Sequence, residues 1–408
     1  MDFQISSELS DIIAGLTAFL DSEVLTRHRD HEKMLADPRQ VYDTDGRYSE
    51  AVLEVLREIR MASAKAGYYT MFVPKSIGGD GLGSEALFRV WEHIFHRYGA
   101  TYFLASEAIA HWARGPSHVL AYATEAAQAR VLPDLLSGEA TVCFAMSEPD
   151  AGSDALRMAT SAVPDGEEWV ISGTKIWISN GPYADYAIVF AVTDREAAAK
   201  RRAGISAFLV PTTTPGYRAD ANIRMFNELG GGESTVYLDE VRVPREMILG
   251  ELHHGFGIAM SGVSAGRLFN SAKGVGLARW AFEQAVEYSQ QREAFGKPIS
   301  ANQGVSFPLA DSAMEIHAAH LMSLHCSWLL DSGQPALKEL SMAKAYSTEM
   351  AVRVIDRAIQ IHGAIGFTNE LGLVSAYETA RRVCVADGTS EILRRAIAKR
   401  LLGGDLDL

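Results

Sequence analysis

The sequence predicts an α+β protein with an N-terminal helical domain, a middle antiparallel β domain and a C-terminal four-helix bundle. Three observations carry this prediction: helical periodicity in the first third, short β-like runs between turn signals in the middle, and long helical stretches after residue 256. A chain of 408 residues is also too long for one ordinary core. We expect domains at residues 1–140, 141–250 and 251–408.

The N-terminal third has the pattern of packed helices. Apolar residues recur near helical spacing at Val52, Leu53, Leu56, Ile59 and Met61. Residues 84–129 are dominated by Ala, Leu and Glu, which indicates further helix. The segment 73–81 is rich in Gly and contains a Pro, so it is expected to form a loop between helices.

The middle third contains short β-like runs at residues 169–172, 187–192 and 207–210. Turn signals with Pro, Gly, Asn or Asp separate these runs, and no helical pattern lies between them. The strands should therefore pair antiparallel. The acidic segment 239–244 is interpreted as a hairpin that supplies the closing strand of this domain, and so as a boundary rather than a site.

The last third returns to helical periodicity in the stretches 268–291, 306–331 and 335–365, which contain few helix breakers. These stretches are much longer than the average helix of about 11 residues. Long helices joined by short connections are typical of a bundle.

Composition excludes several classes of protein. The net charge is -13 and the basic residues are scattered, which argues against a nucleic-acid surface. The sequence contains no run of about twenty apolar residues that could span a bilayer. The acidic N-terminus differs from a basic presequence, so we expect a cytoplasmic location.

The three cysteines, Cys143, Cys326 and Cys384, form neither a C-x-x-C pair nor an even set, which indicates reduced thiols. Histidines on helical stretches lack carboxylates at metal-ligand spacing, so no metal site is expected; they are His111, His317, His320 and His325.

Five segments stand out as candidates for a functional site. Each has an ordinary interpretation when it is taken alone: a surface turn, a core tryptophan, a solvated arginine at a helix end, or an aspartate that caps a helix. The segments are FAMSEPDAGSD at 144–154, WISNG at 177–181, REAFGK at 292–297, QIHGAIGF at 360–367 and VADGTSEI at 385–392.

In this order and spacing, the five segments resemble the motif set of the acyl-CoA dehydrogenase superfamily, from about Phe72 to Leu401. The resemblance implies a flavoprotein that binds FAD and oxidises an acyl-CoA thioester to the trans-2-enoyl-CoA. It also implies an electron-transfer flavoprotein as the acceptor, and a homodimer or homotetramer.

The resemblance implies two groups of FAD contacts. The first lies in the middle domain, where a tryptophan covers one face of the flavin and hydroxyl groups meet its polar edge and pyrophosphate; it comprises Phe144, Met146, Ser147, Gly152, Ser153, Trp177 and Ser179. The second group lies in the C-terminal domain, and most of its residues would reach the FAD of a neighbouring subunit. It comprises Arg292, Phe295, Gln303, Gln360, Ile361, Gly363, Gly366, Thr389 and Glu391.

Asp387 stands where the family has the Glu that removes the substrate α-proton. A weakly acidic α-proton needs a carboxylate in a dry site, where desolvation raises its pKa toward neutrality. Some relatives carry the base on an earlier helix, but the matching position here is Gly266, beside Arg267. The expected substrate contacts are Ser153, Ser264, Arg267 and Gly388, with Ala108, Ala110, His111 and Trp112 as a candidate acyl-pocket wall.

Two departures from the family pattern suggest an unusual substrate. Aspartate is one C–C bond shorter than glutamate, about 1.5 Å, and Ala386 replaces the usual Tyr before the base. We therefore expect a branched or cyclic acyl group that brings its α-carbon nearer Asp387. Two alternatives stay open: a flavin oxidase or monooxygenase, because the nitroalkane-oxidase branch also carries Asp at this position, and a non-catalytic homologue that binds flavin or acyl-CoA.

Overall fold

The computed structural model describes residues 4–201, 203–221, 223–225 and 230–407. It divides into two compact units, each built from separated stretches of the chain. The helical unit comprises residues up to 18, 83–106 and those from 264 onward, and the sheet unit comprises residues 19–82 and 107–263. Among the described residues, no helix is long and apolar enough to cross a membrane.

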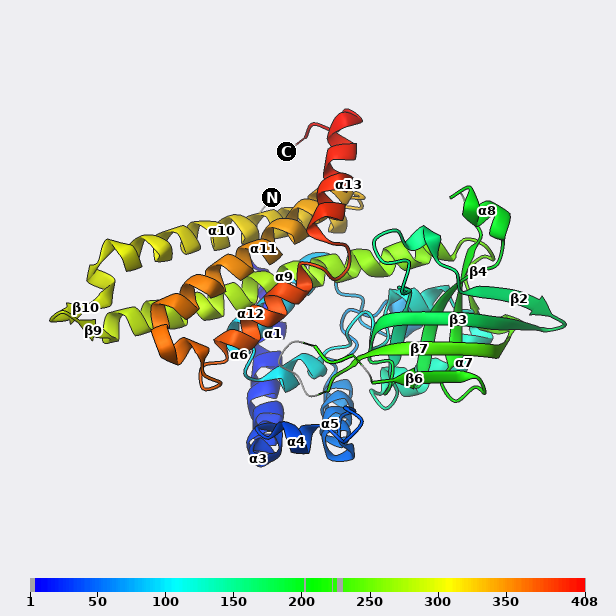
Figure 1. Ribbon diagram of the computed structural model, residues 1–408, viewed down its shortest axis with the longest axis horizontal. Coiled ribbons are helices and arrows are strands. Elements are labelled where there is room, and N and C mark those ends of the chain that lie inside the picture. Colours follow the sequence, from blue (N-terminus) through cyan, green and yellow to red (C-terminus); the bar gives the residue numbers. More distant parts are fainter. Residues whose placement is uncertain (1–3, 202, 222, 226–229, 408) are drawn as a thin grey trace. The chain divides into compact units, whose positions relative to one another are not determined.

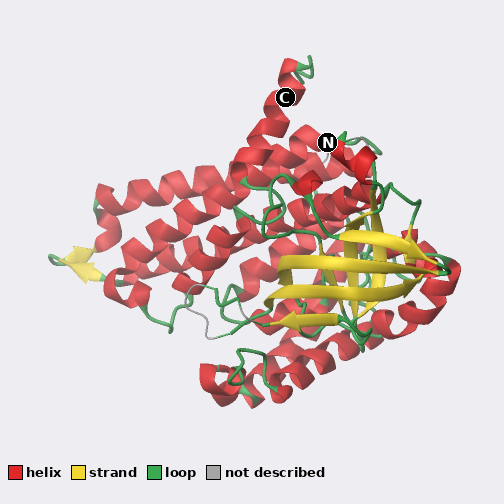
Figure 2. Ribbon diagram, turned by 45° about the vertical axis from the view of Figure 1, so that its right-hand side comes forward, coloured by secondary structure: helices red, strands yellow, loops and turns green. Residues whose placement is uncertain are grey.

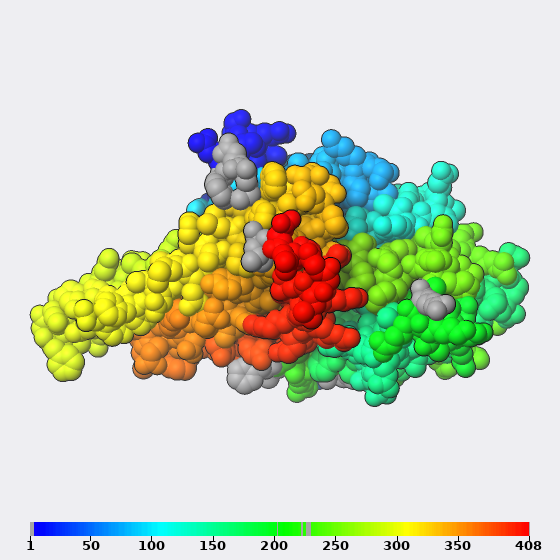
Figure 3. All heavy atoms as spheres, turned by 90° about the horizontal axis from the view of Figure 1, so that it is seen from above, coloured from blue at the N-terminus to red at the C-terminus, as the bar shows by residue number. Residues whose placement is uncertain are grey.

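The helical unit is a bundle of long helices, seen in Figure 1. Its main elements are α6 (Ser84–Tyr98), α9 (Gly255–Gln291, which begins in the sheet unit), α10 (Gln303–Asp331), α11 (Leu337–His362), α12 (Leu373–Val383) and α13 (Ser390–Leu402), and most of α1 (Ser7–Phe19) also belongs to it. Helix α11 packs against α10, α12 and α13. In Figure 3 the C-terminal segment, in red, lies on the surface beside the yellow and orange segments of α10 and α11.

Two glycines allow α9 to pack closely against its neighbours. A Cβ at Gly274 would lie 2.8 Å from the carbonyl oxygen of Ser347 on α11, and a Cβ at Gly276 would lie 2.6 Å from the carbonyl oxygen of Glu92 on α6. Because side chains at these positions would force the helices apart, α9 needs glycine at both contacts. Helix α9 therefore lies at the centre of the bundle.

A short antiparallel hairpin joins α9 to α10. Its strands are β9 (Glu293–Ala294) and β10 (Lys297–Pro298), and Phe295 and Gly296 form the turn with φ values of 53° and 79°. Two residues with positive φ are characteristic of a tight hairpin turn. The long helical stretches expected from the sequence are confirmed, and each differs from the prediction only at its ends.

The sheet unit contains an eight-stranded sheet, drawn in yellow in Figure 2. The order is β6-β7-β3-β2-β4-β5-β8, with β1 paired to β4. The strands are β1 (Val142–Ala145), β2 (Ser161–Asp165), β3 (Glu168–Ser179), β4 (Tyr186–Val192), β5 (Ile205–Pro211), β6 (Tyr217–Asp220), β7 (Glu233–Pro244) and β8 (Ile248–Leu249). Most pairs are antiparallel as predicted, but β1 and β2 both run parallel to β4.

Most helices of the sheet unit come from the N-terminal third, and one short helix lies between β4 and β5. A π-helical turn at Leu20–Val24 leads into four short or medium helices, and two more follow later; they are α2 (Leu25–Asp30), α3 (Glu32–Leu35), α4 (Pro38–Val41), α5 (Glu50–Ala66), α7 (Glu125–Leu136) and α8 (Arg195–Ala199). The expected loop at 73–81 contains a 3-10 turn at Lys75–Ile77.

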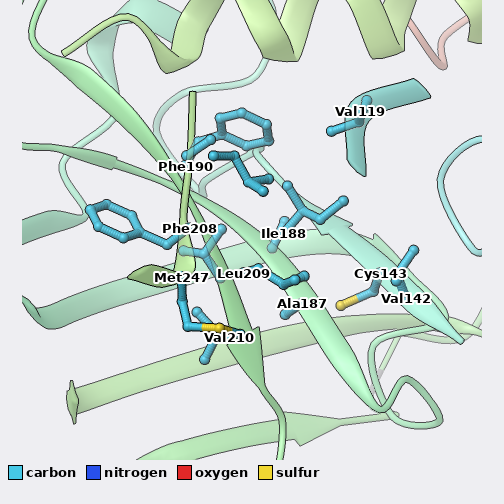
Figure 4. Packing of buried hydrophobic residues seen from close by; sticks show 14 of the residues in the cluster. Val119, Val142, Cys143, Ala187, Ile188, Phe190, Phe208, Leu209, Val210 and Met247 are labelled. Atoms are coloured by element: carbon cyan, nitrogen blue, oxygen red, sulfur yellow. The ribbon is translucent and has the colours of Figure 1, made fainter. Parts of the chain in front are cut away.

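The core of the sheet unit centres on β4 and β5. Ile188 and Phe190 from β4 pack near Phe208 and Leu209 from β5, as Figure 4 shows. Both strands are buried along nearly their whole length, which explains their continuous apolar sequence. Cys143 on β1 lies in the same core, and burial raises the pKa of its thiol to about 12.

Two sequence predictions about local structure are wrong. Residues 84–129 are not helical throughout. Helix α6 ends at Tyr98 and is followed by Gly99, whose φ is 59°, and 3-10 turns at Phe103–Ala108 and His118–Tyr122 precede α7. The segment 239–244 is a strand as expected, but it is the second half of β7 and not a hairpin. Asp239 and Glu240 form a β-bulge opposite Ser172, since the β3–β7 register shifts there and Glu240 has a φ of 52°.

Candidate active site

Asp387 lies in the loop between α12 and α13 and has an unusual backbone conformation. Its φ is 55°, and Gly388 follows with a φ of 99°. A non-glycine residue in the left-handed region costs on the order of 1 kcal/mol and persists only where its surroundings hold it. The loop therefore needs anchors from neighbouring elements.

Two cations from neighbouring helices anchor the backbone of this loop. Nε of Arg267 on α9 donates to the carbonyl oxygen of Asp387 at 3.0 Å. Nζ of Lys344 on α11 donates to the carbonyl oxygens of Gly388, at 2.9 Å, and of Cys384, at 3.3 Å. Lys344 is fully buried. Three carbonyl groups of the loop are thus fixed to the bundle.

The Asp387 carboxylate has its own partner. Nδ2 of Asn270, one helical turn after Arg267 on α9, donates to Oδ2 of Asp387 at 2.7 Å. Burial raises the pKa of Asp387 to about 6, against the opposing effects of Lys344, Arg267, the Asn270 hydrogen bond and Lys273. Burial also lowers the pKa of Lys344 to about 8, although the charge of Asp387 opposes this shift. The site thus holds a desolvated carboxylate that ionises near neutral pH.

Asp387 does not cap the helix that follows it. The cap of α13 is Thr389, whose Oγ1 accepts a hydrogen bond from the backbone N–H of Ile392 at 3.3 Å. Glu391 lies in the first turn of α13 and is exposed, where its charge complements the positive helix end. The simple structural explanation for Asp387 is therefore wrong, and its carboxylate is available for chemistry.

In the sheet unit, the two candidate flavin segments lie side by side. The backbone N–H of Ile176 donates to the carbonyl oxygen of Ser147 at 2.9 Å, which joins the loop 144–153 to the end of β3. The loop closes on itself through two hydrogen bonds between the backbones of Glu148 and Ala151, both 3.1 Å. Ser147 is half-buried, whereas Gly152 and Ser153 are exposed.

A buried ion pair holds this loop in place. Nζ of Lys175 donates to Oε1 of Glu148 at 2.8 Å and to the carbonyl oxygen of Met146 at 3.2 Å. Glu148 also accepts from the backbone N–H of Thr160 at 3.0 Å. Burial lowers the pKa of Lys175 to about 8, against the opposing charge of Glu148. Such a pair, once formed, fixes local geometry because breaking it would leave an unpaired buried charge.

Trp177 is not a core residue. It is 59% exposed, has a φ of 61°, and occupies an irregularity in the β3–β7 register between Ile176 and Ile178. The bulge turns the indole out of the packed face, and the exposed Ser179 follows two residues later. An exposed aromatic ring near the exposed Ser179, whose hydroxyl donates to Oε1 of Glu233 at 3.5 Å, fits the planar ring and polar edge of FAD, so the chemistry of these residues agrees with the expected cofactor.

The FAD candidates from Arg292 to Gly366 lie at one end of the helical bundle, whereas Thr389 and Glu391 lie at the start of α13. Tyr288, near the end of α9, stacks on His362, the last residue of α11, with ring centroids 4.5 Å apart. This contact brings the segment that begins at Arg292 close to the turn that begins at Gly363. Most of these candidates, including Gln360 and the fully exposed Phe295, present their side chains to the surface.

Residues of the expected acyl-pocket wall lie in the sheet unit. Ala108 and Ala110 are buried, and the ring of Trp112 meets Phe144 edge-on with centroids 5.1 Å apart. Nε1 of Trp112 is buried and has no hydrogen-bond partner among the described residues. Ser264 lies on α9 in the helical unit, and Arg267 contacts the Asp387 loop rather than standing free.

Sequence reasoning missed Asn270, Lys344, Glu148 and Lys175. Asn270 could have been noticed because it lies three residues after Arg267, on the same face of α9. Lys344 could have been noticed as a lysine between alanines in an apolar stretch of α11. Among the described residues, no cluster of His, Cys, Asp or Glu could hold a metal ion, and His320 instead contacts Glu92 at 3.0 Å.

Comparison with known proteins places these features in one family. Models of the N-terminal, middle and C-terminal domains of acyl-CoA dehydrogenases match residues 8–139, 143–236 and 253–402. The chain is 38% identical over 337 residues to the mitochondrial short-chain specific acyl-CoA dehydrogenase of Homo sapiens, covering 82% of this chain and 80% of that protein. It is 33% identical over 349 residues to subunit CarC of the caffeyl-CoA reductase-Etf complex of Acetobacterium woodii, covering 86% and 90%.

A solved structure of the same family has a similar fold. The glutaryl-CoA dehydrogenase of Mycobacterium smegmatis, solved in complex with FADH2, matches with a TM-score of 0.82 and 26% identity over 98% of this chain and 95% of that one. The three-part fold class predicted from the sequence is thereby confirmed. The chain belongs to the acyl-CoA dehydrogenase family, whose members are FAD-dependent oxidoreductases acting on CH–CH bonds.

Proposed function

We propose that this protein oxidises an acyl-CoA thioester to the trans-2-enoyl-CoA and that Asp387 is the base that removes the α-proton. The observation that carries this proposal is the half-buried Asp387 carboxylate, held by Asn270 on a loop whose backbone is anchored by Arg267 and Lys344. FAD, when bound, supplies the two-electron acceptor.

The electrostatics of Asp387 suit a general base. A pKa near 6 leaves the carboxylate roughly ten to one ionised at pH 7, yet basic enough to accept a proton. A fully solvated aspartate, with a pKa near 3.9, would be ionised but a weaker base. Desolvation by the bundle thus raises basicity, and the surrounding cations keep the group from becoming permanently protonated.

We propose that FAD binds against Trp177, with hydroxyl and backbone groups of the loop 144–153 and Ser179 at its polar edge. The support is the exposed indole, its position in a bulge, and its direct backbone connection to the loop. Within the second group, the residues from Arg292 to Gly366 would reach the FAD of another subunit in a homodimer or homotetramer. Its support is the exposure of Phe295 and Gln360.

We propose a branched or cyclic acyl group as the substrate. The Asp387 side chain is about 1.5 Å shorter than glutamate, and its exposed neighbour Ala386 presents a methyl group in place of a tyrosine ring. A bulkier acyl chain would fill this space and bring its α-carbon within reach of the carboxylate. We further propose an electron-transfer flavoprotein as partner, since the relative in Acetobacterium woodii is named as a subunit of an Etf complex. The cytoplasmic location stays a prediction.

The experiment is anaerobic mixing of the purified flavoprotein with straight, branched and cyclic acyl-CoAs while the visible absorbance of the flavin is followed. Bleaching by branched or cyclic esters is expected. Equal rates with butyryl-CoA or octanoyl-CoA would contradict the substrate class but leave the reaction intact. Rapid peroxide formation in air without response to thioesters would favour an oxidase, and bound flavin with no reduction by any substrate would favour a non-catalytic homologue.

A further inference from the structure

The Asp387 loop is held by two kinds of contact that have different consequences. Arg267 and Lys344 donate to backbone carbonyl oxygens, so their hydrogen bonds fix the path of the chain. Asn270 donates to the carboxylate itself, at 2.7 Å. The Asn270 side chain is buried, with an exposed fraction of 3%.

An amide is chemically suited to this position. A carboxylate accepts hydrogen bonds and donates none, so the contact atom on Asn270 must be the NH2 group. The amide has no proton to exchange in the neutral range and therefore cannot compete with the substrate for the base. A hydrogen bond to the charged form favours that form and lowers its pKa. The bond also occupies Oδ2 and leaves Oδ1 to receive a proton.

The charges around the carboxylate cannot replace Asn270. Arg267 and Lys273 approach from α9 and Lys344 approaches from α11, and all three favour the ionised form. Arg267 and Lys344 already direct a donor at backbone carbonyl oxygens, and Lys273 lies over the rings of Phe95 and Phe269, 5.0 Å from each centroid. Their Coulombic effect on the carboxylate favours its ionised form, whereas the hydrogen bond from Asn270 also fixes the direction of one oxygen.

We propose that Asn270 is a positioning residue that orients the Asp387 carboxylate and keeps it ionised for proton abstraction. The inference rests on the proposed function, because it assigns Asn270 to the base of that reaction. An aspartate side chain has one rotatable bond fewer than glutamate. A hydrogen bond to its carboxylate therefore leaves little freedom in the orientation of the carboxylate plane, and the alignment of the base depends on Asn270.

The test compares Asn270→Leu and Asn270→Asp with wild type in the purified flavoprotein. Leu removes the donor at similar volume. Asp keeps the size of Asn but places a second carboxylate beside the first, which raises the pKa of the pair further. Ser271→Ala is the matched control, since Ser271 is the fully buried neighbour on α9 and its hydroxyl donates to the carbonyl oxygen of Arg267 without touching Asp387.

The first measurement is the pH profile of flavin reduction at saturating acyl-CoA. We expect the acid limb to move to higher pH by about one to two units in Asn270→Leu and by more in Asn270→Asp. KM should change little, because the effect lies on the base rather than on binding. Ser271→Ala should keep the wild-type midpoint. Unchanged midpoints in both Asn270 variants, with normal flavin content, would overturn the proposal.

A second measurement separates this inference from the function it rests on. The carbonyl stretch of a protonated carboxylic acid can be titrated by infrared spectroscopy, and Asp387→Asn identifies the band of Asp387. We expect its midpoint to rise in both Asn270 variants even without substrate. If no thioester reduces the wild-type flavin, the proposed function falls and this titration still decides whether Asn270 controls the carboxylate. If Asn270→Leu fails to fold, the isosteric Asn270→Asp variant decides.

Discussion

At the scale of single residues, Asp387 combines features that oppose stability. Its backbone is in the left-handed region, and its carboxylate is desolvated. The sequence allowed this residue to be predicted as the base, because five segments in order carried the resemblance and one of them contains Asp387. Asn270 and Lys344 could not be found in the same way, because their roles depend on which faces of α9 and α11 meet the loop. Helical periodicity in one segment does not give that pairing.

The raised pKa of Asp387 predicts a stability difference that depends on pH. Its folded-state pKa of about 6 exceeds the unfolded value near 3.9. Protonated Asp387 therefore contributes fully to the free energy of unfolding below pH ~4, and this contribution is lost as pH rises through ~6. At pH 8 the ionised carboxylate should lower the free energy of unfolding by on the order of 2 to 3 kcal/mol relative to a neutral side chain.

Asp387→Asn should therefore match or exceed wild type in free energy of unfolding at pH 8, and its advantage should shrink toward pH 4. Denaturant unfolding at several pH values measures this difference. A variant that is less stable than wild type at pH 8, with the gap unchanged at pH 4, would show that the carboxylate is not desolvated as described.

At the scale of elements, the site depends on how closely α9 approaches α11. Arg267 and Asn270 come from α9 and Lys344 comes from α11, so a change in the spacing of these helices would pull the anchors of the loop apart. The sequence predicted these helices well because their periodic patterns are long. It did not predict that β1 and β2 run parallel to β4, since pairing direction depends on partners distant in the chain.

Gly274→Ala should disrupt that approach. The new Cβ would lie 2.8 Å from the carbonyl oxygen of Ser347, a backbone atom that cannot move aside easily. We expect a loss of about 1 to 3 kcal/mol in the free energy of unfolding, despite the better helix propensity of alanine. Thermal unfolding measures the change.

Gly257→Ala is the matched control on the same helix, because a Cβ there meets no atom within 4 Å. It should leave stability unchanged or raise it by up to about 1 kcal/mol. If both variants had the same melting temperature, the close contact between α9 and α11 would not be what fixes their spacing.

At the scale of the whole molecule, function is divided between two compact units. The helical unit carries Asp387, the proposed base, together with Arg267, Asn270 and Lys344, and the sheet unit carries Trp177 and the loop 144–153. The sequence predicted three consecutive domains, and those boundaries stay a prediction. The two units instead combine separated stretches of chain, which composition alone cannot indicate because it describes neighbours in sequence rather than in space.

The measurement that tests the central claim most directly is stopped-flow reduction of the flavin by a saturating acyl-CoA, compared between wild type and Asp387→Asn from pH 5 to pH 9. Wild type should gain rate as pH rises through ~6, since Asp387 must be ionised to accept the proton. Asp387→Asn should retain flavin and be slower by about 10²- to 10⁴-fold at every pH. Reduction of Asp387→Asn at the wild-type rate would contradict the assignment of Asp387 as the base.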